Sequence, residues 1–272
     1  SPYYIRNKIS FIKSQMLSNL EIEKFFNTEI DKVCKEIYYL YQEKMIKNNS
    51  IDFDDLISKP VDLFISNSEI LEHYQNKFKY ILIDEYQDTN PVQYKLSTLL
   101  ASKHKNIFVV GDMNQSIYAF RQADYRNILN FEKDYMDCKV IKLEENYRST
   151  NNILNAANSV IKNNKERKDL NLWSEKGDGL KVKYMRAYDE KHEITLVIEE
   201  INKLLESGYK RSEIGILYRT NAQSRVVEEV FLGKGIPYKV VGSYYFYNRK
   251  EIKDLISYLR LIYNNHDEVS LR

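Results

Sequence analysis

The sequence predicts the α/β class, with helices packed against portions of two mostly parallel sheets. Short apolar runs of strand length alternate with segments of helical periodicity, which is typical of β-α-β units. Several of the runs end directly in acidic or polar residues. The chain has 272 residues, 43% hydrophobic and 29% charged, which is enough to bury a substantial core and favours two domains.

The first strong helical pattern spans residues 22–47, and no partner for its apolar stripe is evident elsewhere in the sequence. After a break at residues 48–50, Asp52 is predicted to cap a short helix whose first-turn acids are structural. A further helix at 69–77 leads into the next strand. The stripe consists of Ile22, Phe26, Ile30, Val33, Ile37, Leu40 and Tyr41.

Residues 81–83 form a continuous apolar run, which predicts a central strand covered by helices on both faces. Asp84 and Glu85 follow at its carboxyl end, where ligands bind in open α/β sheets. Thr89 or Asn90 is predicted to cap the next helix, which begins near Pro91.

Such a pair of acids suits phosphoryl transfer. Asp84 could hold Mg²⁺ directly or through water, while Glu85 orients or deprotonates an attacking water. Adjacent acids are also common on solvated surfaces. The buried strand in front of this pair favours the functional interpretation.

Residues 106–112 repeat the design, a buried strand followed by Gly111 and Asp112, and predict a right-handed β-α-β unit with the first strand. Gln115 then lies where a side chain can sense a terminal phosphate. Tyr118, Phe120 and Arg121 supply two rings and a cation, the combination that holds single strands by stacking and charge. Burial of both rings in the core is the alternative.

A third strand is predicted at 139–143, followed by a helix to about residue 163 that Ser149 or Thr150 caps. At the entrance of this helix, Arg148 is placed to reach a phosphate as an arginine finger, and Tyr147 to stack on a nucleobase. A surface salt bridge is the alternative for Arg148.

Beyond the charged run at 162–168, strand and helix alternate again and predict a second, mostly parallel sheet. Gly208 and Gly233 are expected to end the two helices. An aromatic run at 244–249 opens a last helix and either contacts nucleic acid or packs against the sheet. The predicted strands are 180–186, 214–218 and 238–241, and the predicted helices are 190–207 and 222–232.

The composition excludes some classes of protein. No apolar run approaches the roughly 20 residues of a membrane helix. The net charge of +2 gives no support to nucleic-acid binding from bulk charge, so such binding must rest on local patches. Cys34 and Cys138 do not have metal-ligand spacing and are expected to be free thiols in a reducing compartment.

Taken together, several segments resemble the UvrD/PcrA/Rep type of superfamily 1 DNA helicases, in order from about residue 51 to the C-terminus. The resembling segments are DEYQDTN at 84–90 (motif II), GDMNQSIYAFRQAD at 111–124 (motif III), NYRST at 146–150 (motif IV), YRTNAQSR at 218–225 and RKEIKD at 249–254.

The resemblance implies ATP and Mg²⁺ as cofactors, with Asp84 holding the metal and Glu85 activating the attacking water. Gln115 would contact the terminal phosphate and couple it to the DNA site, Arg148 would be the arginine finger, and Tyr147 would stack on adenine. The track for single-stranded DNA would be lined by Tyr118, Phe120 and Arg121.

This sequence departs from the family pattern in several places. Phe120 stands where Trp is usual, Gln122 where Gly is usual, and Met113 and Asn114 where acids are common. The phosphate loop Gly-x-x-x-x-Gly-Lys-Ser/Thr is absent, as are motifs V and VI. We therefore expect a fragment that is inactive alone.

By resemblance the fold comprises portions of two RecA-like (P-loop NTPase type) motor domains. Residues 1–50 would be a helical part of an insertion in the first motor domain, 51–145 the C-terminal part of that domain, and 146–272 the N-terminal part of the second.

The implied parent is a cytoplasmic, nucleoid-associated bacterial enzyme that moves 3′ to 5′ on single-stranded DNA and unwinds duplex in repair or replication. Its partners would be single-stranded DNA, duplex junctions, the missing remainder of the helicase chain and repair or replication loading proteins, with no membrane. Three alternatives stay open: a subunit of an AddA/RecB-like helicase-nuclease, a truncated protein that only binds DNA or a partner, and a metal-dependent nuclease built on Asp84, Asp88 and Asp112.

Overall fold

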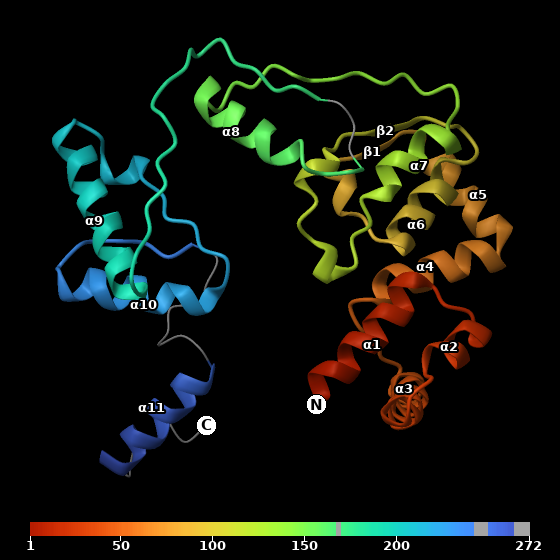
Figure 1. Ribbon diagram of the computed structural model, residues 1–272. Helices are drawn as coiled ribbons and strands as arrows, with labels where there is room; N and C mark the ends of the chain where they lie inside the picture. The colour runs from red at the N-terminus through yellow and green to blue at the C-terminus, as the bar shows by residue number, and fades with distance from the viewer. Residues whose placement is uncertain (167–169, 242–249, 264–272) are drawn as a thin grey trace. The chain divides into compact units, whose positions relative to one another are not determined.

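The computed structural model describes residues 1–166, 170–241 and 250–263 (Figure 1). The chain divides into two compact units, Ser1–Val182 and Lys183–Arg272. No helix among the described residues is long and apolar enough to cross a membrane. The predicted α/β class is confirmed by a parallel pair of strands in a helix-rich chain, while the three-part domain division stays a prediction.

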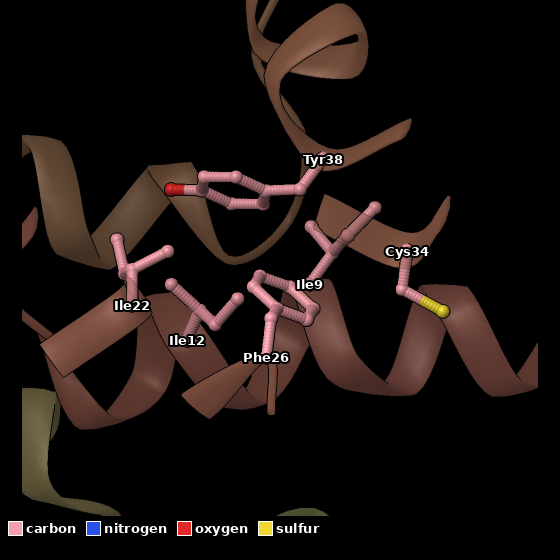
Figure 2. Packing of buried hydrophobic residues seen from close by; sticks show 6 residues of the cluster. All are labelled: Ile9, Ile12, Ile22, Phe26, Cys34 and Tyr38. Carbon is pink, nitrogen blue, oxygen red and sulfur yellow. The ribbon is translucent and has the colours of Figure 1, made fainter. Parts of the chain in front are cut away.

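The N-terminal helices are α1 (Pro2–Gln15), α2 (Asn19–Phe25) and α3 (Glu29–Lys47). The single helix predicted for 22–47 is wrong, because Thr28 caps a new helix through a reciprocal pair of hydrogen bonds with Asp31. Helix α1, which the sequence did not predict, supplies much of the missing partner for the stripe. Figure 2 shows the resulting core, made of Ile9, Ile12, Ile22, Phe26, Cys34 and Tyr38.

The other half of the predicted stripe is not buried. Ile30, Val33 and Leu40 of α3 expose 70%, 56% and 50% of their surface. The two halves differ because α3 turns one side toward α1 and α2 and leaves the opposite side in solvent. Cys34 and Cys138 are free thiols, as predicted.

Helix α1 is joined to α4 (Asp55–Ser66) by buried charges. The ammonium of Lys13 lies 2.6 Å from Asp52 and 2.9 Å from Asp55. Asp52 also accepts the backbone N–H of Asp55 at 2.8 Å. Asp52 just before α4 and Asp55 in its first turn are therefore structural, as predicted. They orient α4, which precedes α5 (Ser68–Lys77).

Strands β1 (Ile81–Ile83) and β2 (Ile107–Val109) are parallel neighbours joined through α6 (Pro91–Ala101). Asn90 caps α6 with a capping box and Pro91 is its first residue, both as predicted. The expectation that helices cover both faces is wrong in this structure. Leu82 and Phe108 are 72% and 60% exposed, because α6 packs against one face of this two-stranded sheet and the described residues leave the other face open.

The region after β2 contains short 3-10 turns, then α7 (Arg126–Asp134) and α8 (Asn151–Ile161). The strand predicted at 139–143 is not formed. No residue of this segment is paired in the described region. The nearest pairing is an isolated bridge between Glu145, just beyond the segment, and Trp173. Without a neighbouring strand to accept and donate hydrogen bonds, an apolar run of this kind stays extended but unpaired.

The second unit holds α9 (Glu190–Glu206), α10 (Asn221–Gly233) and α11 (Lys250–Tyr263). Helices α9 and α10 agree with the predicted 190–207 and 222–232 within one residue, and α11 agrees with the prediction of a last helix. Gly208 follows α9 with a φ of 95°, as expected of a glycine that ends a helix. The predicted cap at Gly233 is wrong, because this residue is inside α10 and the positive φ occurs at Gly235. Ile194, Ile198, Ile201 and Phe231 form the core between α9 and α10.

The strands predicted at 180–186, 214–218 and 238–241 are not paired into a sheet in the described part of the chain. The segment 214–218 still behaves as a strand with one buried face, since Ile214 and Ile216 pack on the α9–α10 core while Leu217 is 94% exposed. What is missing is a neighbour for its backbone hydrogen bonds. The aromatic run at 244–249 lies outside the described residues.

Candidate functional site

The carboxyl ends of β1 and β2 form the centre of the candidate site. Val110 donates its N–H to Ile83 at 2.9 Å, and Tyr86 donates its N–H to Val110 at 2.9 Å. These two bonds hold the turn after β1 beside the turn after β2. The pattern of two adjacent strand ends followed by polar residues was predicted from the sequence, and the strand pairing confirms it.

Asp84 and Glu85 are both exposed at this edge. Glu85 has a φ of 49° and a ψ of 45°, a left-handed conformation that non-glycine residues seldom adopt. Its backbone N–H donates to Oδ1 of Asp84 at 2.9 Å. Because the backbone reverses at Glu85, the two neighbouring carboxylates both remain accessible at the strand end.

Tyr86 is the anchor of the turn. Its side chain is only 1% exposed and packs edge-on against Phe131 of α7, with ring centroids 5.7 Å apart. Burial raises the pKa of its phenol to about 12. A large apolar side chain fixed directly after Glu85 keeps the position of the exposed acids constant.

The turn after β2 carries Gln115. Asp112 accepts the N–H of Asn114 at 2.9 Å, which caps the 3-10 turn Met113–Gln115. Its second oxygen accepts a hydrogen bond from Nε2 of Gln115 at 3.0 Å. Gln115 is exposed and belongs to the same edge of the sheet as Asp84 and Glu85.

Tyr118, Phe120 and Arg121 form one cluster a few residues further on. The two ring centroids are 5.8 Å apart, and the Arg121 guanidinium lies 5.2 Å from the Tyr118 ring and 5.7 Å from the Phe120 ring. Phe120 is 71% exposed, so the alternative of a core ring is wrong for this residue. The cluster offers an aromatic face and a positive charge to solvent.

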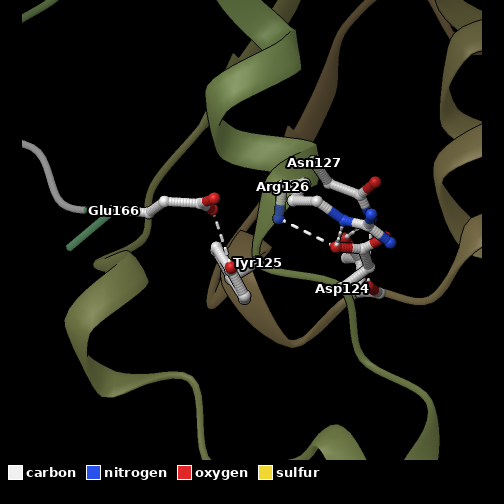
Figure 3. A network of polar contacts seen from close by, with 6 residues as sticks. Asp124, Tyr125, Arg126, Asn127 and Glu166 are labelled. Atoms are coloured by element: carbon white, nitrogen blue, oxygen red, sulfur yellow. Dashed lines mark hydrogen bonds and ion pairs between the residues drawn. The ribbon is translucent and has the colours of Figure 1, made fainter. Parts of the chain in front are cut away.

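The end of this loop is tied back to the first turn, and Figure 3 shows its polar contacts between Arg126 and Asp124 and between Tyr125 and Glu166. Asp124 donates its N–H to the carbonyl of Thr89, and the Asn127 amide donates to the same carbonyl, both at 3.0 Å. Arg126 pairs with Asp124 at 2.7 Å and lowers the pKa of that carboxyl through its hydrogen bonds. Tyr125 donates to Glu166 at 2.8 Å.

Tyr147 and Arg148 lie in a different neighbourhood within the first unit. The Tyr147 phenol donates to Glu145 at 2.8 Å, a hydrogen bond that raises its pKa. Asn146 accepts the N–H groups of Arg148 and Ser149 at 2.9 and 2.7 Å, which shapes the entrance of α8. Their described hydrogen bonds stay within residues 144–176, and none of the contacts described for them reaches Asp84 or Glu85.

The donor chemistry at the Asp84 edge fits a magnesium ion that also binds phosphates. Mg²⁺ is usually held by one or two carboxylates together with waters and phosphate oxygens, and Asp84 and Glu85 provide exposed carboxylates. The described residues contain no group of three His, Cys, Asp or Glu side chains able to hold a metal alone. Asp84, Asp88 and Asp112 therefore do not form such a group in this structure.

Two residues of the site received no role from the sequence. Gln87 is 1% exposed and bonds to both turns. A Cβ on Gly111 would lie 2.6 Å from Oε1 of Gln87, so only glycine leaves room for that side chain. A glutamine inside an acidic motif and a glycine directly after a strand were the available signals.

Comparison with known proteins assigns the chain to a family. Residues 2–136 match the model of the UvrD/REP helicase N-terminal domain, and residues 141–272 match the UvrD-like helicase C-terminal domain.

Two staphylococcal relatives are both named ATP-dependent DNA helicase PcrA. The Staphylococcus epidermidis protein is 52% identical over 264 residues, or 97% of this chain and 36% of that protein. The Staphylococcus aureus protein is 51% identical over 264 residues, again 97% of this chain and 36% of that protein. The chain thus spans about a third of the length of these relatives. With both family models covering nearly all of it, the chain belongs to the UvrD-like family of DNA helicases.

Proposed function

We propose that the protein carrying this chain is an ATP-dependent helicase that moves 3′ to 5′ on single-stranded DNA and unwinds duplex in repair or replication. The observation that carries the proposal is the junction of the two strand ends. It joins two exposed carboxylates to a loop that holds a glutamine, the half-buried Tyr118, the exposed Phe120 and an arginine. Such a junction can couple hydrolysis of a bound phosphate to a change in the binding of a DNA strand.

In this proposal the nucleotide is ATP, and the residues have separate roles. Asp84 holds Mg²⁺, and Glu85 accepts a proton from the attacking water. Gln115 bonds to the terminal phosphate. A bound Mg²⁺ would neutralise negative charge on the phosphate oxygens.

Arg148 is proposed as the arginine finger and Tyr147 as the ring that stacks on adenine. Both are exposed, and the Tyr147 ring is 74% exposed, so each is accessible to a ligand. In this proposal the 144–150 region closes on the strand ends when nucleotide binds, so that Arg148 reaches a phosphate held at Asp84. Closure of this type is the usual way in which such sites are completed.

Tyr118, Phe120 and Arg121 are proposed to hold single-stranded DNA by base stacking and charge, without reading sequence. Further proposed partners are duplex junctions, the remaining part of the helicase chain and repair or replication loading proteins. The proposed location is the cytoplasm, at the nucleoid. The proposed domain boundaries are 1–50, 51–145 and 146–272.

One observation favours a second candidate function. The chain contains no phosphate loop, and without that loop its hold on ATP would be weak. A product consisting of this chain alone would then bind DNA or a partner without turning over ATP. An AddA/RecB-like subunit is not favoured, because the relatives bear the PcrA name.

The test measures ATP hydrolysis with and without oligo-dT, in the 272-residue chain and in the complete protein that carries it. We expect strand-stimulated hydrolysis in the complete protein, its loss in Glu85→Gln, and no turnover by the 272-residue chain. Turnover that survives Glu85→Gln would refute the assigned role of Glu85. Tight strand binding without hydrolysis in both proteins would favour the second candidate.

A further inference from the structure

Gln87 is a polar side chain buried at the centre of the site. It is 1% exposed, while Glu85 two residues earlier is exposed. A buried carboxamide is costly unless its donors and its acceptor are paired. The identity of its partners therefore tells what the residue holds in place.

Each polar atom of the Gln87 carboxamide has a partner. Nε2 donates to Oε2 of Glu85 at 2.7 Å and to Oδ2 of Asp88 at 3.3 Å. Oε1 accepts the backbone N–H of Asp112 at 3.0 Å. The opposite orientation of the amide would place its oxygen against two carboxylates, so the partners themselves determine which end is nitrogen.

These bonds continue on both sides. Asp112 accepts a hydrogen bond from Gln115, and the Gln87 carbonyl accepts one from Ser116 at 3.3 Å. A continuous series thus runs from Glu85 through Gln87 and Asp112 to Gln115. Its first and last members are exposed side chains of the proposed phosphate site, while Gln87 is buried and Asp112 half-buried.

The surroundings give Gln87 little freedom. A Cβ on Gly111 would meet its oxygen at 2.6 Å, so the carboxamide occupies the space that a side chain at 111 would need. Tyr86, the neighbour before it, is equally buried. Glu85, in contrast, is held only at its backbone and by the amide of Gln87 among the contacts described for it.

We infer that Gln87 is a positioning residue that fixes the carboxylate of Glu85 and couples its position to the loop of Gln115. This inference rests on the proposed function. It assigns to the buried amide the link between the water-activating group and the phosphate-sensing loop. Neutrality matters as much as shape, because the amide lies between two carboxylates.

The decisive variant is Gln87→Glu in the complete protein, with kcat and KM for ATP measured from pH 5.5 to 9 with saturating oligo-dT. The glutamate keeps the size and the acceptor for Asp112, but it loses both donors and adds a third carboxylate. Like charges at this distance favour an extra shared proton. We expect kcat to fall about 10- to 100-fold at pH 7, with KM nearly unchanged, and the acid limb of the profile to move up by at least about one pH unit.

A second variant, Gln87→Met, replaces the amide by an apolar side chain of similar size and is compared with Gln115→Ala and with the double variant. Residues that act through one series of contacts lose activity non-additively. We expect the double variant to be less impaired than the product of the two single losses. Urea unfolding of each variant identifies any that fails to fold, and the other variant then decides.

Three outcomes would overturn the inference. The first is a kcat of Gln87→Glu within twofold of that of the unmodified protein, and the second is a loss of kcat that is independent of pH and accompanied by a parallel rise in KM. The third is a double variant whose loss of kcat equals the product of the two single losses. Glu85→Gln in the same assay distinguishes failure of this inference from failure of the proposed function. If it abolishes turnover while the Gln87 variants behave as the parent, only the role of Gln87 fails. If it leaves turnover intact, the proposed function of Glu85 fails as well.

Discussion

The ammonium of Lys13 in α1 lies 2.9 Å from a carboxylate oxygen of Asp55 in α4, and the two side chains expose only 6% and 3% of their surface. The pair joins two helices that are far apart in sequence, and Asp52 completes it at 2.6 Å. Breaking a buried pair by removing one partner leaves an uncompensated charge.

The variant Lys13→Met should therefore lower the free energy of unfolding of the 272-residue chain by about 3 kcal/mol, measured by urea unfolding. The control is Lys103→Met. Lys103 pairs with Glu72 near the surface, with 35% and 62% exposure, and its loss should cost less than about 1 kcal/mol. Equal effects of the two variants would contradict a special role for the buried pair.

The cluster of Lys13, Asp52, Asp55 and Tyr41 predicts that the folded state loses stability at alkaline pH. Burial lowers the pKa of Lys13, but the hydrogen bonds and charges of Asp52 and Asp55 outweigh this effect and raise it above 10.5. Burial and the hydrogen bond to Asp52 raise the pKa of Tyr41 from 10.0 to about 12. A raised pKa in the folded state gives stability that is present below the unfolded pKa and lost as pH rises through the folded one.

The free energy of unfolding should accordingly decline between about pH 10 and pH 12, and the decline should be shallower in Tyr41→Phe. Urea unfolding at half-unit steps of pH measures this decline in the free energy of unfolding. Tyr188→Phe serves as control, because Tyr188 is 96% exposed and should leave the slope unchanged. An identical slope in Tyr41→Phe would show that Tyr41 does not contribute.

Gly111→Ala should destabilise the first unit by about 1 to 3 kcal/mol, because the new methyl group would lie 2.6 Å from Gln87 and 2.9 Å from Ile128. Gly215→Ala is the matched control, since a Cβ there meets nothing within 4 Å. The two variants are compared by urea unfolding. A neutral Gly111→Ala would mean that the two turns have more room between them than the structure indicates.

Phe120→Ala should weaken binding of oligo-dT to the complete protein by about 10-fold, because stacking on an aromatic side chain contributes roughly 1 to 3 kcal/mol per base. Phe120→Trp should bind at least as tightly, since it presents a larger face. Fluorescence anisotropy measures both. Tyr188→Ala, which removes a still more exposed ring elsewhere, should have no effect; if it weakens binding as much, the assignment of the DNA track is wrong.

Arg148→Ala should lower kcat of the complete protein by about 1000-fold, as expected for an arginine finger, while affinity for oligo-dT stays unchanged. Steady-state hydrolysis at saturating oligo-dT measures it. Arg225→Ala is the control, because Arg225 is exposed and its side chain pairs with Glu229 at 2.7 Å. A loss below tenfold in Arg148→Ala would favour the surface interpretation of this residue.

The local signals predicted local structure well. Asn90 and Pro91 determined where α6 begins, and the apolar run before Asp84 correctly marked a strand that ends in acids. These features depend on contacts within a few residues, which is why periodicity and capping residues are sufficient to find them. The family motifs added the chemistry expected of Glu85 and Gln115.

Features that depend on distant partners were decided only by the tertiary structure. The stripe at 22–47 found its partner in α1, and the apolar run at 139–143 stayed unpaired. The cap at Thr28 that divides this stripe is local, since Asp31 lies three residues away, but the regular apolar periodicity concealed it. The role of Gln87 also emerged only here, since its bonds cross from one strand end to the next. The sequence alone determined many of the helical and extended segments and the family that they resemble, but not α1 or α7. Only the tertiary structure determined burial, strand pairing and the coupling of the two turns, because hydrogen bonds and packing between distant segments have no local signature in the sequence.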